Sequence, residues 1–512
     1  MSTQQVIWIA IAVYVIFIAA VGVMNRRRSS NISEFTVGKR NAGAWMSAFS
    51  YGTAYFSAVM FIGYAGKSGW GYGGWAVLIG IGNAVFGSLI AWLVLAKRTR
   101  EITHRLQIKS MPQFFSARFA SERMKRFVVA VIFIFLLPYS ASVYKGLTSV
   151  CSVLLQVDEN VCMAVIAIAS MAIVILGGYS AILKADFIQG LIMLAGVIAL
   201  ILAVMRCGQV GGFSQGMQAL ADSTKDLKLG AAAYAGLIAT ILMTSFGTWG
   251  LPQMIHKYYG IRDDKEVRRG TIISTVFAFV VAGGGYFIGS FSHLFFKDLS
   301  EIPGSGAGNP DYLIPNMLLS SDLTNLLIAV VLVLLVAASV STLSSITITA
   351  SSTLTMDFVQ PVVLKSAEQK KTMITTKVIC AVFIVLSYII ANSNTLILDM
   401  MSYSWGIISG SFLAPYMISL YSKKINRFGA WCGMLGGFIV ALPPVLCKVL
   451  GLGISISGLG AVMDLGPHFA CAAMILSFPL CFIGSAIAAK LNLPSAENND
   501  KFYSADYVVN KE

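Results

Sequence analysis

Long apolar stretches recur along nearly the whole chain, and they constrain its fold more than any other feature. Each is about twenty residues long, the length that a helix needs to cross the hydrocarbon core of a bilayer. A backbone inside lipid must satisfy its own hydrogen bonds, so these stretches predict helices and an all-α polytopic membrane protein. We expect about thirteen spans, at residues 5–24, 44–67, 72–97, 125–152, 159–181, 185–207, 232–257, 268–298, 323–359, 372–393, 397–421, 427–450 and 467–490.

The composition agrees with a membrane protein. Hydrophobic residues make up 57% of the chain and charged residues 12%, about half the charged fraction of a typical soluble domain. The first apolar run follows MSTQQ, with no basic segment before it and no small-residue cleavage site after it. We therefore expect a retained first helix and not a cleaved signal peptide.

The formal net charge of +14 predicts an orientation in the membrane and no nucleic-acid partner. Acidic residues lie in loops that follow even-numbered spans, on one side of the membrane, at Asp158, Glu159, Glu301, Asp311 and Asp322. Basic residues gather after the first, third, seventh and eleventh spans, at Arg26, Arg27, Arg28, Lys39, Arg40, Lys97, Arg98, Arg100, Arg105, Lys109, Arg118, Arg123, Lys125, Arg126, Lys257, Arg262, Lys265, Arg268, Arg269, Lys423, Lys424 and Arg427. The positive-inside rule then places the N-terminus outside and the C-terminus in the cytoplasm of a multi-pass protein of the plasma (inner) membrane.

Residues for enzyme chemistry show no useful spacing. The eight cysteines and four histidines are scattered and form no metal-binding or disulfide pattern, so we expect no enzyme. A membrane-embedded enzyme and a transporter-like sensor remain remote alternatives, and we expect no obligate protein partner.

A run of hydroxyl side chains lies where the chain should be crossing the bilayer. Between Ala337 and Thr355, eleven of nineteen residues are serine or threonine. Ala338, Ser341, Thr342 and Ser345 follow a spacing of i, i+3, i+4 and i+7, which places them on one helical face. Such a face offers oxygen without charge, which suits a hard monovalent cation, although hydroxyl residues also serve as contacts between membrane helices.

Two spans contain related interruptions. Ser50-Tyr51-Gly52-Thr53 lies in the second span, and Ser245-Phe246-Gly247-Thr248 lies in the seventh, followed by Pro252. Matching breaks in two halves are typical of transporters with inverted repeats and a binding site near the membrane midplane. The predicted units are a first helix with a cytoplasmic loop (1–43), two five-helix repeats (44–207 and 232–421), two C-terminal helices (422–494) and a cytoplasmic tail (495–512).

Several short pieces, in this order and spacing, carry a resemblance to a known family. They are Gly52-Thr53-Ala54-Tyr55-Phe56-Ser57-Ala58, Pro112-Gln113-Phe114-Phe115, Gly177-Gly178-Tyr179, Ala185-Asp186-Phe187-Ile188-Gln189, residues 338–345 and Met401-Ser402-Tyr403-Ser404-Trp405-Gly406. With them the chain resembles the sodium/solute symporter family, in its proline/pantothenate branch. The resemblance implies a leucine-transporter-like 5+5 inverted repeat. It also implies sodium-coupled import of a small organic solute (carboxylate, amino-acid-like or vitamin-like) by alternating access, with Na⁺ as coupling ion.

The resemblance also implies site residues. The family's main sodium site falls here on the carbonyls of Thr53, Phe56 and Ala338 and the hydroxyls of Ser341 and Thr342. A second sodium site, present in some members, would use Asp186 with Ser341, Ser344 and Ser345. The alternative for Asp186 is an ion pair with nearby Lys184.

The solute should bind beside the two breaks. Lys145 either receives a solute carboxylate or extends to water and a structural partner. Tyr55, Val59 and Met60 stand where sugar carriers have amide and carboxylate side chains, which makes a sugar a poor fit. Thr244 and Thr248 stand where the proline carriers have large aromatic side chains, which makes proline itself a poor fit. The implied lining residues are Tyr55, Phe56, Ser57, Val59, Met60, Tyr139, Thr244, Thr248, Trp249 and Trp405.

Other modes of coupling remain open. A proton-coupled symporter of the same fold is the main alternative, because Asp186 could titrate where a relative binds sodium. A sodium/sugar symporter is a further one. In every case the expected partners are a small solute, a coupling ion and the lipid bilayer.

Overall fold

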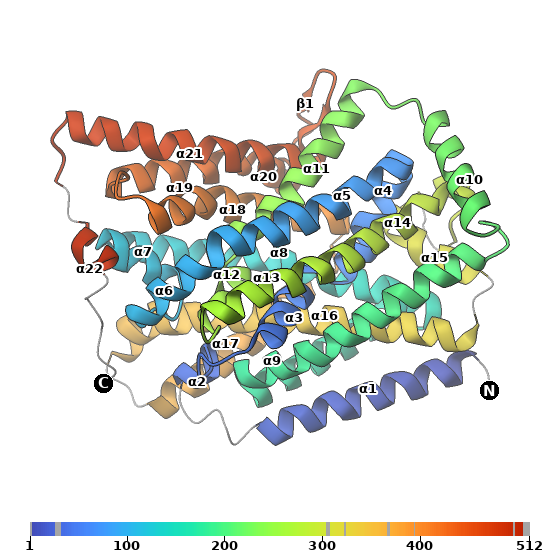
Figure 1. The fold of residues 1–512 in the computed structure, drawn as a ribbon, viewed down its shortest axis with the longest axis horizontal. Helices are drawn as coiled ribbons and strands as arrows, with labels where there is room; N and C mark the ends of the chain where they lie inside the picture. Colours follow the sequence, from blue (N-terminus) through green and yellow to red (C-terminus); the bar gives the residue numbers. More distant parts are fainter. Residues whose placement is uncertain are drawn as a thin grey trace.

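The computed structural model describes residues 3–25, 32–303, 308–321, 324–365, 369–393, 395–494 and 497–504. Nearly all of them are helical, as the apolar runs predicted, and the helices lie side by side in one bundle (Figure 1). Helix α1 (Thr3–Asn25) begins at one end of the bundle, and the short helix α22 lies at the other.

The first half of the chain contains one strongly interrupted span. Short 3-10 or π-helical segments carry the label η. The elements are α2 (Ile32–Thr36), α3 (Ala44–Tyr55), η2 (Val59–Tyr64), α4 (Ala65–Tyr72), η3 (Gly73–Ala76), α5 (Val77–Gly82), η4 (Asn83–Ile90), η5 (Trp92–Ala96), α6 (Lys97–Arg105), α7 (Met111–Phe119), α8 (Glu122–Leu155), α9 (Glu159–Arg206) and α10 (Phe213–Asp226).

The second half contains the other broken span and the hydroxyl-rich helix. Its elements are α11 (Ala231–Gly250), α12 (Pro252–Tyr259), α13 (Asp264–Ala278), η6 (Phe279–Gly283), α14 (Gly284–Ser290), η7 (Phe291–Leu294), η8 (Leu299–Glu301), η9 (Pro310–Tyr312), α15 (Leu313–Ser320), α16 (Asn325–Leu354), η10 (Thr355–Leu364), α17 (Gln369–Ala391) and α18 (Ile397–Tyr421).

The C-terminal part adds helices against α18. They are α19 (Arg427–Ala441), α20 (Pro443–Leu450), η11 (Val462–Asp464), α21 (Gly466–Lys490) and α22 (Asn499–Tyr503). A two-stranded antiparallel hairpin, β1 (Ser455–Ile456) and β2 (Gly460–Ala461), precedes α21.

Helix α9 contains the two predicted spans 159–181 and 185–207, which meet at a sharp bend. Gly178 at the bend has φ 62° and ψ −176°. This left-handed conformation is open to glycine and costly for other residues. A Cβ at this position would also lie 2.8 Å from the Phe35 ring, so Gly178 is required for both reasons.

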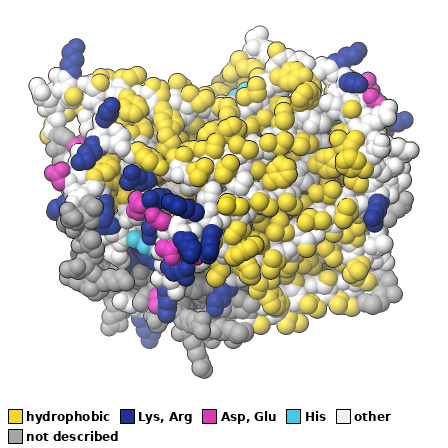
Figure 2. All heavy atoms as spheres, in the orientation of Figure 1, with side chains coloured by type: hydrophobic (Ala, Val, Ile, Leu, Met, Phe, Trp, Pro, Cys, Tyr) yellow, Lys and Arg dark blue, Asp and Glu magenta, His cyan; other side chains and the backbone are white. Residues whose placement is uncertain are grey.

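By length and composition, eight helices among the described residues are apolar enough to cross a membrane, or nine if the bent pair α19 and α20 is one span. The all-α membrane class is confirmed, and the count of thirteen stays a prediction. Hydrophobic side chains cover much of the visible face of the bundle, whereas lysine and arginine gather toward the end that holds α6 and α22 (Figure 2).

Helices α3, α9, α12 and α16 position the candidate site. Helix α16 packs against α3, α8, α9 and α12. Every residue of α16 from Ala337 to Thr353 is buried, so its hydroxyls face other helices over their whole length. The polar run is therefore an internal surface of the bundle.

Candidate functional site

The first broken span breaks later than the sequence predicted. Helix α3 runs through residues 50–53 without interruption and ends at Tyr55, where Phe56 is extended with φ −106° and ψ 113°. Hydroxyl groups satisfy the backbone donors that follow: the amide of Ala58 donates to Ser339 Oγ at 3.3 Å, and the amide of Val59 to Ser57 Oγ at 3.3 Å. The break is therefore stabilised by a hydroxyl of α16 and by its own serine.

The second broken span also breaks later than predicted. Helix α11 continues through residues 245–248 to Gly250, and Leu251 takes the extended values φ −76° and ψ 122°. Pro252 begins α12, and a proline disfavours the helical conformation in the residue before it. The break therefore follows from Pro252, and Gly247 instead allows close packing, because a Cβ there would lie 2.6 Å from the Trp405 ring.

The end of α3 meets the hydroxyl face of α16. Thr342 Oγ1 lies 2.9 Å from the carbonyl oxygen of Thr53 and 3.1 Å from that of Ala338. Ser341 Oγ lies 2.9 Å from Thr53 Oγ1. These contacts bring together four of the five residues expected at the main sodium site, and Phe56 occupies the adjacent break.

The donor set of this cluster fits sodium. It consists of two backbone carbonyls and three hydroxyls, on Thr53, Ala338, Ser341 and Thr342, and all four residues are buried. Oxygen ligands without formal charge attract an alkali cation and still allow it to leave.

Asp186 lies beside this cluster and is fully buried. Ser341 Oγ donates to Asp186 Oδ1 at 2.5 Å, and Ser50 Oγ donates to Asp186 Oδ2. The ammonium of Lys257 lies 3.2 Å from Oδ2 in an ion pair whose side chains are 2% and 0% exposed. The structure thus gives Asp186 a cationic partner other than Lys184, the one considered from the sequence.

One further residue of the expected second sodium site, Ser345, contacts the same ammonium. Lys257 Nζ donates to Ser345 Oγ at 2.9 Å, and it lies 5.6 Å from the centroid of the Tyr179 ring. The hydroxyl of Ser344 is buried and has no hydrogen-bond partner among the described residues. Asp186, Ser341 and Ser345 therefore converge, with Lys257 Nζ between Asp186 and Ser345.

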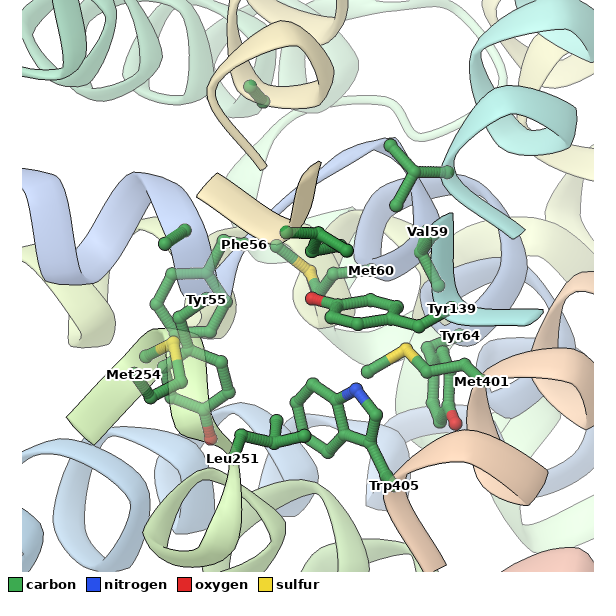
Figure 3. Packing of buried hydrophobic residues seen from close by; sticks show 14 of the residues in the cluster. Tyr55, Phe56, Val59, Met60, Tyr64, Tyr139, Leu251, Met254, Met401 and Trp405 are labelled. Carbon is green, nitrogen blue, oxygen red and sulfur yellow. The ribbon is translucent and has the colours of Figure 1, made fainter. Parts of the chain in front are cut away.

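Aromatic and thioether side chains gather next to the first break. The rings of Tyr55 and Phe56 stack with their centroids 4.1 Å apart. The Trp405 ring lies 6.2 Å from Tyr55 and 5.6 Å from Tyr139, edge to face with the latter. Figure 3 shows these four rings together with Met60, Met401 and Val59. We call Tyr55, Phe56, Met60, Tyr139, Met401 and Trp405 the aromatic cluster.

The aromatic cluster is almost entirely apolar, with few polar atoms. The indole Nε1 of Trp405 is buried and has no hydrogen-bond partner among the residues described. The hydroxyl of Tyr55 donates to the carbonyl of Thr244 at 2.6 Å. The Trp405 N–H is therefore an unpaired donor within an apolar cluster.

Other predicted solute residues lie in helix contacts outside the aromatic cluster. Thr244 Oγ1 donates to Asn83 Oδ1 at 2.8 Å, and Thr248 Oγ1 to the carbonyl of Ser245 at 2.9 Å. Trp249 Nε1 donates to the carbonyl of Phe86 at 3.0 Å. The Trp249 ring also lines a separate apolar cavity of about 440 Å³ between α11, α18 and α21. The contacts of Thr244 and Trp249 join α11 to η4, and Ser57 stabilises the break.

Lys145 also lies elsewhere. Its ammonium donates to the carbonyls of Ser393 and Thr395, at 2.9 and 2.8 Å, in the segment between α17 and α18. Asp399 of α18, a buried carboxylate, pairs instead with Lys67 at 3.7 Å. These contacts fit the structural role considered for Lys145, and its role toward a solute carboxylate stays a prediction.

Sequence reasoning missed two polar residues of α12. Lys257 was assigned to a cytoplasmic loop, yet the residue is 3% exposed and paired with Asp186. Gln253 is 1% exposed, and neither its side-chain oxygen nor its nitrogen has a partner within the described part of the chain. The sequence did contain a signal for both residues. They follow Pro252 within two helical turns, and a helix that starts after such a break can remain inside the bundle.

Comparisons with known proteins agree with this geometry. A model of the Sodium:solute symporter family matches residues 35–437. The chain is 25% identical over 426 residues to the high-affinity proline transporter PutP of Bacillus subtilis (strain 168), covering 81% of this chain and 87% of the relative. It is 25% identical over 449 residues to a sodium/proline symporter of Haemophilus influenzae, covering 84% and 86%.

Solved structures share the fold. A Na⁺-coupled sialic acid symporter in a substrate-bound outward-open state superposes with a TM-score of 0.75 at 18% identity, covering 96% of this chain and 98% of the other. The nucleobase-cation-symport-1 transporter MHP1 in a closed conformation gives 0.53 at 13% identity, covering 88% and 94%. At these identities the likeness establishes the fold alone, and it confirms the leucine-transporter-like class predicted from the sequence.

Proposed function

We propose a position for the sodium ion of this protein, which belongs to the sodium:solute symporter family. The ion binds where the end of α3 meets α16. The family makes the protein a membrane transporter that couples sodium to a small solute. The finer assignment is the ion's position among Thr53, Phe56, Ala338, Ser341 and Thr342. The observation that carries it is the 2.9 Å contact between Thr342 Oγ1 and the Thr53 carbonyl.

The proposed site links two parts of the fold that must move relative to one another. Thr53 lies just before the break in α3, whereas Ala338, Ser341 and Thr342 lie on the long helix α16. An ion shared by both stabilises the conformation in which they touch. Sodium binding therefore favours one state of the transport cycle, and loss of the ion releases α3 from α16.

The aromatic cluster is the proposed solute site. It adjoins the break, so a bound solute and a bound sodium contact the same segment of α3. The Trp405 N–H suits a carboxylate, and the surrounding rings suit a compact apolar body. We therefore propose a small carboxylate or amino-acid-like solute. Proline is the first to test, because the relatives named above include proline transporters. A sugar would leave most of its hydroxyls without partners.

The distribution of charge supports one orientation of the protein in the membrane. Basic side chains such as Arg98, Arg100 and Arg269 lie on elements of the loops that the sequence assigns to the cytoplasm. We propose a plasma-membrane protein with its N-terminus outside and its C-terminus in the cytoplasm. The sodium gradient and the membrane potential then both favour uptake, with about 2.3 kcal/mol per charge for each 100 mV.

Uptake into proteoliposomes tests the proposal. Purified protein would be supplied with radiolabelled proline, and then with other amino acids and carboxylates, under an inward sodium gradient. An inward potassium gradient and an inward proton gradient at equal osmolarity serve as controls. Accumulation under the sodium gradient alone supports the proposal. Accumulation driven by protons without sodium would overturn it.

A further inference from the structure

We propose that the ammonium of Lys257 permanently occupies the second cation position of this transporter, so that the protein binds one sodium ion per cycle. The inference rests on the proposed sodium site at Thr53 and Thr342, which supplies the single exchangeable ion. It concerns a different set of atoms, those around Asp186. Lys257 would then determine the ratio of sodium to solute.

The first support is the position of the ammonium. Lys257 Nζ lies 3.2 Å from Asp186 Oδ2 and 2.9 Å from Ser345 Oγ. These are oxygens of the residues that would coordinate a second sodium ion. The ammonium has the same charge as sodium and donates hydrogen bonds to the oxygens that the ion would contact.

The second support is the charge balance of the buried region. Asp186 brings one negative charge and Lys257 one positive charge, and both side chains are essentially unexposed. A sodium ion in the same position would have to share that single carboxylate with the ammonium of Lys257, and the two like charges would repel one another in a buried place. The pair as it stands therefore excludes a second ion from these oxygens.

The third support is the number of hydrogen bonds that the Asp186 carboxylate already accepts. Ser341 donates to Oδ1, while Ser50 and Lys257 donate to Oδ2. The carboxylate thus receives three hydrogen bonds, which is most of its capacity as an acceptor. A second ion would have to displace one of these donors.

The tethered ammonium also has a consequence for the fold. Lys257 lies on α12, immediately after the break at Leu251, and it reaches Ser345 on α16. In the proposed sodium site, the other broken span reaches α16 through Thr53. Each broken span would therefore be joined to α16 by a cation, an exchangeable ion for α3 and a lysine for α12.

Ser341 connects the two positions. Its hydroxyl lies 2.5 Å from Asp186 Oδ1 and 2.9 Å from Thr53 Oγ1. A hydroxyl has one hydrogen, and the carboxylate is the stronger acceptor. The Ser341 oxygen then keeps its lone pairs for the sodium site. The Asp186–Lys257 pair thus orients one of the proposed sodium ligands.

The test counts sodium ions bound to the purified transporter by equilibrium dialysis with radioactive sodium chloride. We expect one ion per wild-type protein and two in Lys257→Met, because the neutral side chain frees Asp186 and Ser345. Lys257→Arg, which retains the charge, is the matched control and should bind one. Two ions in the wild type, or one in Lys257→Met, would overturn the proposal.

Two further variants separate failure of this proposal from failure of the proposed sodium site. Thr342→Ala in the Lys257→Met background should reduce the count from two to one. Asp186→Asn combined with Lys257→Met removes both charges, so it avoids an unpaired buried ion and should bind one. If this double variant binds two ions, Asp186 is not a ligand and the inference fails. A wild type that binds none contradicts the sodium site itself.

Discussion

The two proposed cation positions lie next to one another beside α16, and they are built from different chemistry. The position at Thr53, Ser341 and Thr342 consists of neutral oxygens. The position at Asp186 consists of a carboxylate paired with the ammonium of Lys257. Only 2.5 Å separates Ser341 Oγ of the first from Asp186 Oδ1 of the second.

The difference follows from whether the cation must leave. An exchangeable ion has to be released in each cycle, so neutral ligands that bind it weakly are suitable. A lysine cannot leave, and its charge in a buried place requires a permanent counter-charge. The contrast teaches that a carboxylate in such a bundle does not by itself indicate a second ion site.

The largest effect on stability should come from disrupting the Asp186–Lys257 ion pair. Asp186→Ala leaves the Lys257 ammonium buried without a partner, which should cost about 3–5 kcal/mol of stability. We expect a large drop in the temperature of aggregation or unfolding in detergent. Asp186→Ala combined with Lys257→Met should recover most of that loss. Equal instability of the single and double variants would show that the loss of stability does not come from the unpaired ammonium.

Substitutions at the proposed sodium site should change sodium dependence; Thr342→Ala should affect folding little, whereas Ser341→Ala also removes a hydrogen bond to the buried Asp186 carboxylate. Ser341→Ala and Thr342→Ala each remove one proposed ligand, worth about 1.5–3 kcal/mol. The sodium concentration for half-maximal uptake should therefore rise by about tenfold or more. Thr347→Ala is a matched control, because this buried threonine of α16 has no partner for its hydroxyl among the described residues. Unchanged sodium dependence in both Ser341→Ala and Thr342→Ala would contradict the proposed sodium site.

A substitution in the aromatic cluster separates solute binding from both cation positions. Trp405→Phe keeps a ring but removes the unpartnered indole N–H. If that group donates to a carboxylate, solute affinity should fall by about tenfold while sodium binding stays the same. The comparable change Trp431→Phe, on α19 beside Phe127, should leave solute affinity unaltered. Equal effects of the two substitutions would exclude Trp405 as a solute contact.

Asp311 is a buried carboxylate that no ammonium contacts within the described residues, and its substitution should give the smallest effect. It lies in η9, outside the apolar spans, where burial raises its pKa to about 6 although the backbone N–H of Ile397 donates to it. The folded protein therefore binds the proton more tightly than the unfolded chain does. The resulting stabilisation is complete at low pH and is lost as the pH rises through about 6.

Asp311→Asn tests the predicted loss of stability with rising pH. The amide oxygen still accepts the hydrogen bond from Ile397, but the group no longer titrates. Between pH 5 and pH 7, the stability of the wild type should fall by about 1 kcal/mol relative to the variant. Thermal unfolding in detergent at the two pH values measures the difference. A parallel pH dependence of the two proteins would contradict the assignment to Asp311.

The local patterns of the sequence determined a large part of the result. Hydrophobic run length predicted the all-helical membrane bundle, because a helix in lipid must be apolar over its whole length. The spacing of Ala338, Ser341, Thr342 and Ser345 predicted one polar face, because helical periodicity is a local property. Family membership, the fold and sodium coupling were likewise predicted, and the comparisons confirmed them.

Only the tertiary structure decided which polar groups meet. Lys257 follows an apolar run and carries a charge, so the sequence alone assigned it to a loop, whereas the turn at Leu251 directs α12 inward to Asp186. The same reason applies to Trp249 and Lys145, whose direction depends on how α11 and α8 are rotated against their neighbours. Sequence periodicity specifies which face of a helix a residue occupies, but the partner of that face depends on packing between segments far apart in the chain.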